Sequence, residues 1–275
     1  MKRSLVIFAV LALAGLPAIS SAQGNLFVTG HDSDDHANGD YQRAGLDYLF
    51  FGSIATPAQV TTRATKKIGY LGNSNASSFG AATSGYTNRT FIDLASPTWT
   101  SIAFAPGAFD ALIIGTGEDY VFSTGSAALN AASAQFASYF NAGGSLYLNS
   151  EQGIGQSFYN FLPPFGVSQG NSISAAGAFS ATPAGLSIGL TEAIVDADIT
   201  HTTFANVPNI FTIFETYNVD GSAVAIGLRQ GTIDTGGGGF QGGGSGAVPE
   251  PSTYGMIGAA VLMAGVMLRR RLARR

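Results

Sequence analysis

The feature that most constrains the fold of this chain is a series of short apolar segments, each followed directly by glycine or polar residues. Segments of this kind, typical of buried strands, occupy residues 25–30, 66–72, 109–115 and 145–149. Between them, apolar residues recur at helical spacing over 41–51 and 126–141. Because strands and helices alternate, we expect an α/β domain with an open, mainly parallel sheet and helices on both faces.

Later segments extend this plan. Residues 158–165 indicate a short helix, and residues 211–216 and 223–228 predict late strands that form an antiparallel edge. In an open α/β sheet, ligands bind beyond the carboxyl ends of the strands. The polar residues that follow the predicted strands are therefore the candidates for function.

Composition excludes several classes of protein. Only 11% of the 275 residues are charged and the net charge is -4, which excludes a nucleic-acid-binding surface and a charge-rich disordered chain. Hydrophobic residues make up 45% of the chain, enough for a sizeable core. The absence of cysteine excludes disulfides, thiolate metal sites and a cysteine nucleophile.

The N-terminal segment has the three parts of a secretory signal peptide. Residues 1–3 include two basic side chains, residues 5–16 are apolar, and Ser20 and Ala22 are small residues at cleavage spacing. The alternative, a retained membrane anchor, is disfavoured because the apolar run is too short to span a bilayer easily. We expect residues 1–22 to direct export, with cleavage after Ala22.

The C-terminal region combines a linker with a short apolar stretch. Residues 236–247 are mostly glycine, which supplies no side chains for a core. After them come Pro249, Glu250 and Pro251, an apolar run over 254–268 and an arginine cluster over 269–271. The chain is thus expected to comprise a signal peptide (1–22), an α/β domain (23–235), a glycine-rich linker (236–247) and a sorting and anchoring segment (248–275).

Pro249, Glu250 and Pro251, the apolar helix and the arginines resemble the PEP-CTERM sorting signal in their order. The resemblance implies recognition by an exosortase-type membrane enzyme, with the cut near Pro-Glu-Pro. It also implies a Gram-negative envelope protein associated with extracellular polysaccharide. Before processing, the C-terminal hydrophobic helix would anchor the chain in the inner membrane, with the arginines on the cytoplasmic side. The processed protein would then reach the cell surface or the extracellular matrix.

The α/β domain resembles the class I glutamine-amidotransferase-like, flavodoxin-like fold over roughly residues 25–170. The resemblance is carried by the segments 29–32, 110–115 and 143–150. Catalytic members have a cysteine on the turn after the last of these strands. Ser150 occupies the nearest place here, and Asn149 and Glu151 stand where glycines usually flank the nucleophile. The resemblance therefore implies the fold rather than the amidotransferase reaction.

The densest polar cluster follows the first predicted strand. His31, Asp32, Asp34 and His36 offer imidazole and carboxylate ligands to a divalent metal, the one cofactor that the sequence suggests. The loop completes neither an EF-hand pattern nor a zinc signature. The alternative is a solvated loop in which His31 and Asp32 cap or brace the next element.

Ser150, with Glu151 beside it, is the candidate nucleophile of a serine-type hydrolase. A serine needs a base such as histidine within hydrogen-bond reach, and His201 is the remaining histidine of the chain. Asp198 or Glu215 would supply the third member of a triad. The chain lacks the Gly-x-Ser-x-Gly elbow, and the alternative is an ordinary turn at a strand end.

Two further patterns carry weaker signals. Residues 115–119 begin with Gly-x-Gly, but the two acids that follow would repel a phosphate, so we expect a loop that caps the next helix. Tyr41, Tyr120 and Tyr159 would line a sugar-binding cleft or, more simply, belong to the core.

These observations leave a choice of functions. The first is a non-catalytic α/β module that binds a small molecule, a glycan or a protein partner. The second is a serine hydrolase that uses Ser150 and His201. The third is metal-dependent binding through the loop 31–36. The missing cysteine and the incomplete nucleophile elbow favour a binding module over an enzyme.

Overall fold

The computed structural model describes residues 23–34, 36, 38–72, 85–115, 126–149, 167–234 and 239–241. These residues belong to one compact unit within residues 1–242. The expected signal peptide, the expected short helix over 158–165 and the expected C-terminal hydrophobic helix lie outside the described residues. None of the helices in the described ranges has the length and apolar character needed to cross a membrane.

Parallel strands form one half of the sheet. In spatial order they are β3 (Arg89–Asp93), β2 (Ile68–Gly72), β4 (Ala111–Ile114), β5 (Ser145–Asn149) and β1 (Gly24–Thr29). All of them except β3 lie where the sequence predicts strands, because both faces of each one are buried and its residues are mostly apolar.

Antiparallel strands form the other half. The sheet continues from β1 through β10 (Ala223–Asp234) and β8 (Thr200–Ala205) to β6 (Ser168–Ala175). Off this path, β9 (Thr212–Tyr217) and β11 (Gly239–Gln241) pair with β10, and β7 (Phe179–Ala181) pairs with β9.

The α/β class is confirmed, but the sheet is mixed rather than mainly parallel. The late strands predicted at 211–216 and 223–228 form an antiparallel pair, with Ile226 opposite Ile213. They do so because the turn between β9 and β10 is too short for a parallel crossover. β10 is not an edge strand, since β1 pairs with its other side.

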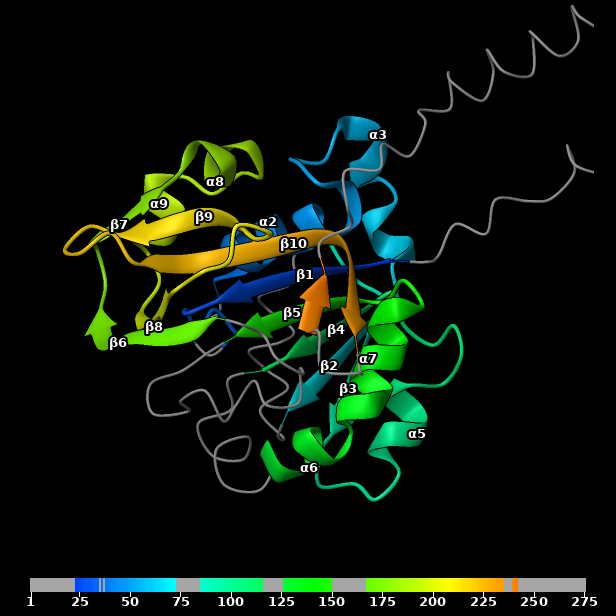
Figure 1. Ribbon diagram of the computed structural model, residues 1–275. Coiled ribbons are helices and arrows are strands. Elements are labelled where there is room, and N and C mark those ends of the chain that lie inside the picture. The colour runs from blue at the N-terminus through cyan, green and yellow to red at the C-terminus, as the bar shows by residue number, and fades with distance from the viewer. Residues whose placement is uncertain are drawn as a thin grey trace, which may run out of the picture. The chain divides into compact units, whose positions relative to one another are not determined.

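Helices cover both faces of the sheet (Figure 1). α2 (Gly39–Phe51) packs against β1 and β5 on one face. The other face is covered by α5 (Trp99–Ala103), α6 (Ser126–Ala131) and α7 (Ser133–Asn141). The shorter helices are α3 (Pro57–Val60), the 3-10 helix η1 (Arg63–Thr65), α8 (Pro183–Ser187) and α9 (Glu192–Val195).

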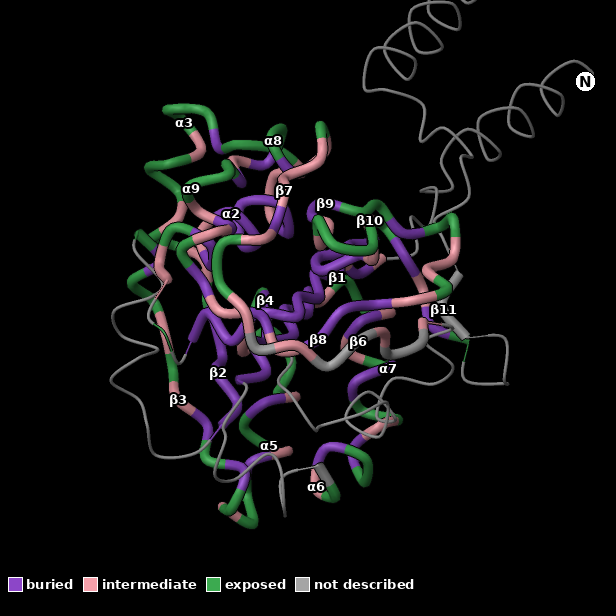
Figure 2. Tube along the Cα trace, turned by 90° about the vertical axis from the view of Figure 1, so that its left-hand side faces the viewer, coloured by how far each residue is buried: buried purple, intermediate pink, exposed green. Residues whose placement is uncertain are grey.

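Alternating side chains divide the core between these faces. In β1, Leu26 and Val28 join the cluster under α7, whereas Phe27 joins the cluster under α2. β5 repeats the pattern, with Leu148 under α7 and Tyr147 under α2. Figure 2 shows the result, a buried centre formed by the strands and by much of α2, with exposed residues mainly on the shorter outer helices.

The two long predicted helices are present, with one change. α2 begins after Asn38, whose side chain accepts a hydrogen bond from the Tyr41 amide, and it ends at Gly52, where φ is 79°. The predicted helix over 126–141 is two helices, α6 and α7. They meet at Ala132, whose φ of -97° and ψ of 13° depart from helical geometry.

Candidate functional site

The carboxyl end of β1 lies directly against the start of β8. The amide of His201 donates to the carbonyl of Gly30 at 2.9 Å, and His31 forms a bridge with Thr200. A Cβ on Gly30 would stand 1.8 Å from the carbonyl oxygen of Thr202, so only glycine permits this approach. The contact brings the loop after β1 to residues 198–201, which are far away in the sequence.

Asp32 is at the centre of the first polar group. Its side chain is 1% exposed, and its two oxygens accept hydrogen bonds from two histidines. Nδ1 of His36 donates to Oδ1 at 2.8 Å, and Nε2 of His201 donates to Oδ2 at 3.0 Å. Asp32 thus connects the loop before α2 with strand β8.

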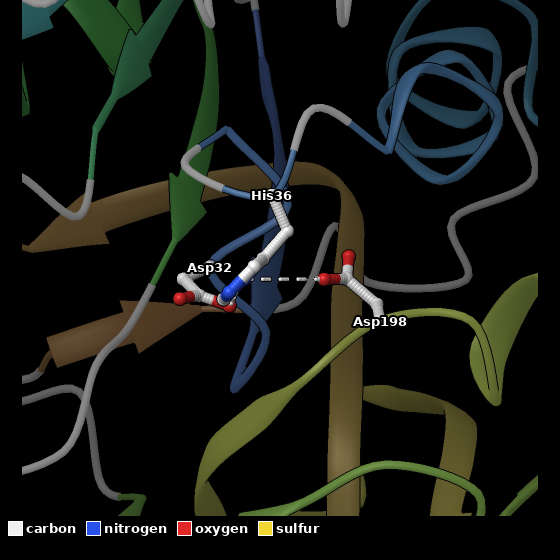
Figure 3. Close-up of side chains that lie close together, drawn as sticks. All are labelled: Asp32, His36 and Asp198. Atoms are coloured by element: carbon white, nitrogen blue, oxygen red, sulfur yellow. Dashed lines mark hydrogen bonds and ion pairs between the residues drawn. The ribbon is translucent and has the colours of Figure 1, made fainter.

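Asp198 lies on the other side of His36 (Figure 3). Its side chain is completely buried, and its Oδ1 accepts from the Ile199 amide at 3.0 Å and lies 3.9 Å from Nδ1 of His36. Its Oδ2 is buried and has no hydrogen-bond partner in the described part of the chain. Burial, reinforced by the negative charge of Asp32, raises the pKa of Asp198 to about 6, although His31 and His36 oppose this shift.

Asp32, His36 and Asp198 can together hold a metal ion. Each offers one ligand atom, and these atoms all lie within 4.8 Å of one another. The His36 side chain is 36% exposed, so this group reaches solvent. The rings of His36 and His201 are stacked, with centroids 6.4 Å apart and an angle of 16° between their planes.

A second polar group lies behind the first and is completely buried. Nε2 of His31 contacts Oε1 of Glu215 at 2.7 Å, and Tyr41 donates to Oε2 of Glu215 at 2.7 Å. Nδ1 of His31 lies 3.1 Å from the carbonyl oxygen of Ile199. Because a carboxylate only accepts, Nε2 of His31 carries a proton. Nδ1 also lies 2.9 Å from the Thr200 hydroxyl, which can donate or accept.

The electrostatics of His31 agree with this assignment. Burial alone would lower the pKa of His31, but the Glu215 carboxylate, helped by Asp198 and the Ile199 carbonyl, outweighs it and raises the pKa above its usual value. Burial and Glu215 also raise the pKa of Tyr41, which therefore stays neutral and donates. His31 and Glu215 form a buried ion pair.

Asp34 and Ser33 fix the loop to the parallel strands. The Tyr70 hydroxyl donates to Asp34 at 2.6 Å. The Ser33 hydroxyl donates to Oδ1 of Asn149 at 3.0 Å, and the Asn149 amide donates to the carbonyl of Ile114 at 3.2 Å. These bonds connect the loop to β2, β5 and β4.

The described members of the predicted site are thus distributed over three places. Of the predicted metal ligands, Asp32 and His36 lie together, whereas His31 pairs with Glu215 and Asp34 with Tyr70. Of the predicted catalytic residues, His201 contacts Asp32, and Ser150 and Glu151 lie outside the described residues. The structure adds Asp198 to the group around His36. The spacing of the loop residues 31–36 did not indicate that Asp198 would join them.

A separate cavity of about 670 Å³ opens at the amino ends of the parallel strands. Its wall includes residues within two positions of the starts of β1, β2, β4 and β5, namely Asn25, Lys66, Asp110 and Ser145. Partly buried aromatic side chains contribute the apolar surface: Phe50, Phe104, Phe109 and Tyr139. This cavity lies at the amino ends of the strands, whereas Asp32 lies at their carboxyl ends.

Comparison with known proteins identifies the C-terminal region. Residues 247–271 match the model of the PEP-CTERM protein-sorting motif, which confirms the prediction made from Pro249, Glu250 and Pro251. No curated protein and no solved structure matches the chain. The chain carries a PEP-CTERM motif and is an exported protein that an exosortase sorts after transient anchoring at the membrane.

Proposed function

We propose that this protein is an envelope or extracellular-polymer-associated protein whose α/β domain is a non-catalytic binding module. The match of residues 247–271 to the sorting motif carries the envelope part of the proposal, because it gives the chain a destination outside the cytoplasm. The binding part is argued from the cavity at the amino ends of the strands. An exported domain without cysteine depends on its own packing for stability, and the two core clusters on either face of the sheet supply that packing.

Delivery would use both terminal segments. Residues 1–22 would act as a cleaved signal peptide, and residues 254–268 would enter the inner membrane as a hydrophobic helix with the arginines at 269–271 on the cytoplasmic side. The exosortase-type enzyme would cut near Pro249, Glu250 and Pro251. The linker expected over 236–247 includes β11, which pairs with β10, so the glycine-rich residues after that strand, 242–247, would keep this reaction away from the folded domain.

A binding role fits the chemistry of the buried polar residues. Both oxygens of Glu215 and both ring nitrogens of His31 are used in contacts inside the domain. The absence of cysteine removes the nucleophile of the amidotransferase-like family, and a shared fold would not carry that reaction over.

The cavity at the amino ends of the strands is the proposed place for a small molecule or glycan. Its volume of about 670 Å³ lies within the range of ligand pockets. Aromatic faces such as those of Phe109 and Tyr139 pack against the apolar faces of sugar rings, and Asn25 and Asp110 offer polar atoms to hydroxyl groups.

One contact supports a serine hydrolase as the second candidate. Asp32 holds Nε2 of His201 at 3.0 Å, the kind of carboxylate–histidine pair that orients a general base. Ser150 would be the nucleophile and Glu151 its neighbour. Activity towards an ester or glycan substrate that Ser150→Ala leaves unchanged would refute this candidate.

Cell fractionation tests the sorting proposal. The full chain is expressed in a host with an exosortase, and the comparison is a chain with Pro249→Ala and Glu250→Ala. We expect the unaltered chain to be shortened and to reach the surface or medium, and the double variant to stay unprocessed in the inner membrane. Equal processing of the two chains would contradict the proposal. Pro208→Ala, within the folded domain, is the control.

A further inference from the structure

We propose that Asp32, His36 and Asp198 bind a divalent transition-metal ion, with zinc as the reference ion and His201 as the residue that positions Asp32. This site is independent of the sorting signal and of the cavity proposed for a glycan. The three ligands come from the loop after β1 and from the residue pair just before β8. Its ligand atoms already lie within 4.8 Å of one another.

The spacing of the ligand atoms suits a small cation. Four ligands at the zinc bond length of 2.0–2.1 Å in a tetrahedron lie about 3.3 Å apart. Nδ1 of His36 is 2.8 Å from Oδ1 of Asp32 and 3.9 Å from Oδ1 of Asp198, so these two separations bracket that value.

Asp198 gives the second, independent reason for a cation. Its side chain is completely buried, its carboxylate faces His36 (Figure 3), and Oδ2 has no hydrogen-bond partner in the described residues. A buried carboxylate oxygen without a partner is costly, and buried charges in proteins are normally paired or coordinate metals. A cation bound by both carboxylate oxygens of Asp198 would supply the missing partner of Oδ2.

The donor atoms indicate the class of metal. Calcium and magnesium prefer ligand sets made only of oxygen, whereas an imidazole with carboxylates suits zinc, manganese, iron, cobalt or nickel. The chain contains no cysteine, which excludes thiolate coordination. The solvent-exposed side of His36 leaves room for water as a fourth ligand and provides an entry path.

His201 acts through Asp32. Its Nε2 donates to Oδ2 of Asp32 at 3.0 Å, which leaves Oδ1 directed at His36. Hydrogen bonds of this kind fix the orientation of a metal ligand, and their loss typically weakens metal binding by about 10- to 100-fold. His31 is not part of the proposed set, because Glu215 and the Ile199 carbonyl already occupy its ring nitrogens.

The test is a metal titration of the untagged full-length protein, purified in detergent and treated with chelator. Calorimetry and thermal unfolding are followed with Zn²⁺, Mn²⁺ and Ca²⁺. We expect Zn²⁺ to bind with one ion per chain and to raise the unfolding midpoint by several degrees. No midpoint shift with Zn²⁺ and Mn²⁺, or a larger shift with Ca²⁺, would overturn the proposal.

Matched variants locate the site. Asp198→Asn and His36→Gln should each weaken zinc binding by about tenfold or more, whereas Asp40→Asn, an exposed acid paired with Arg43, should leave it unchanged. Each variant is also melted without metal to show that it folds. Asp198→Asn removes a buried charge and keeps the side-chain shape, so this variant should fold. Equal zinc affinity in all of these proteins would show adventitious binding and overturn the site.

His201→Gln tests the positioning role. We expect weaker zinc binding while X-ray absorption of the zinc-loaded variant still shows one nitrogen ligand among oxygen ligands. Loss of a nitrogen ligand would make His201 a direct ligand, and unchanged affinity would remove its role altogether. His36→Gln, by contrast, should lose the nitrogen ligand.

Discussion

Nε2 of His31 lies 2.7 Å from Oε1 of Glu215, and both side chains are completely buried. The other oxygen of Glu215 accepts from Tyr41, and the other nitrogen of His31 contacts the Ile199 carbonyl. Burying an ion pair costs solvation energy that only good geometry and additional hydrogen bonds offset. Both conditions are met here, so the pair connects the end of β1 to β9 through the interior.

Glu215→Gln should destabilise the domain by about 3 kcal/mol, because it leaves a buried imidazole without its counter-ion. The measurement is the free energy of unfolding in urea. Glu192→Gln, at an exposed acid on α9, is the control and should change stability little. Similar unfolding curves for the two variants would show that the His31–Glu215 pair is not an important source of stability.

The His31–Glu215 pair should make the free energy of unfolding depend on pH. The pKa of His31 is raised in the folded protein, whereas an unfolded histidine titrates at about 6.5. The contribution of His31 is therefore complete below about pH 6.5 and is lost as the pH rises through its folded pKa. Urea unfolding from pH 6 to 8 should show this decline, and Glu215→Gln should remove it. A rise in stability over this interval would contradict the assignment.

Replacing Asp198 with asparagine should stabilise the metal-free protein. The pKa of Asp198 is raised from 3.8 to about 6, so the folded state binds its proton more tightly and loses stability as the pH rises between these values. Above pH 6 the cost is on the order of 3 kcal/mol. Asp198→Asn should recover up to that amount at pH 7, measured by urea unfolding with chelator present. The control is Asp40→Asn, and a clear loss of stability in Asp198→Asn would refute the prediction.

Gly30→Ala should prevent folding or cost several kcal/mol, because its Cβ would stand 1.8 Å from the Thr202 carbonyl oxygen. Gly107→Ala is the matched comparison, since its Cβ would meet nothing within 4 Å and only the φ of 67° opposes it, at about 1 kcal/mol. Circular dichroism and thermal unfolding distinguish the two. Equal midpoints would mean that the start of β8 moves away from β1 without loss.

The sequence predicts the strands that are buried on both faces. β1, β2, β4 and β5 consist largely of apolar residues, so each one appears as a continuous run. β3 and β6 were not predicted. β3 has only one buried residue, Ile92, and β6 has the polar sequence SQGNSISA. Pairing with neighbouring strands forms these two elements, and the sequence of a single segment does not contain that information.

The candidate site was predictable only where its parts are close in sequence. Asp32 and His36 lie four residues apart in one loop, and the sequence places both in a polar cluster. Asp198 and His201 reach them only because β8 approaches Gly30, a contact that depends on the tertiary fold. His31 and Asp34 looked like ligands of the same kind, but Glu215 and Tyr70 bind them from other strands.

The position of β10 has a mechanical consequence. The last long strand pairs with β1 on one side and with β8 and β9 on the other, and its end at Asp234 leads toward the linker. In a protein held by its C-terminal segment, a pull on that segment would first reach β11, which pairs antiparallel with the end of β10, and would pass along the axis of β10 only through that pair. The hydrogen bonds to β1 lie across that axis, so they would bear the load together in shear rather than open one after another. The short β10–β11 pair would therefore carry such a load before the bonds between β10 and β1 do.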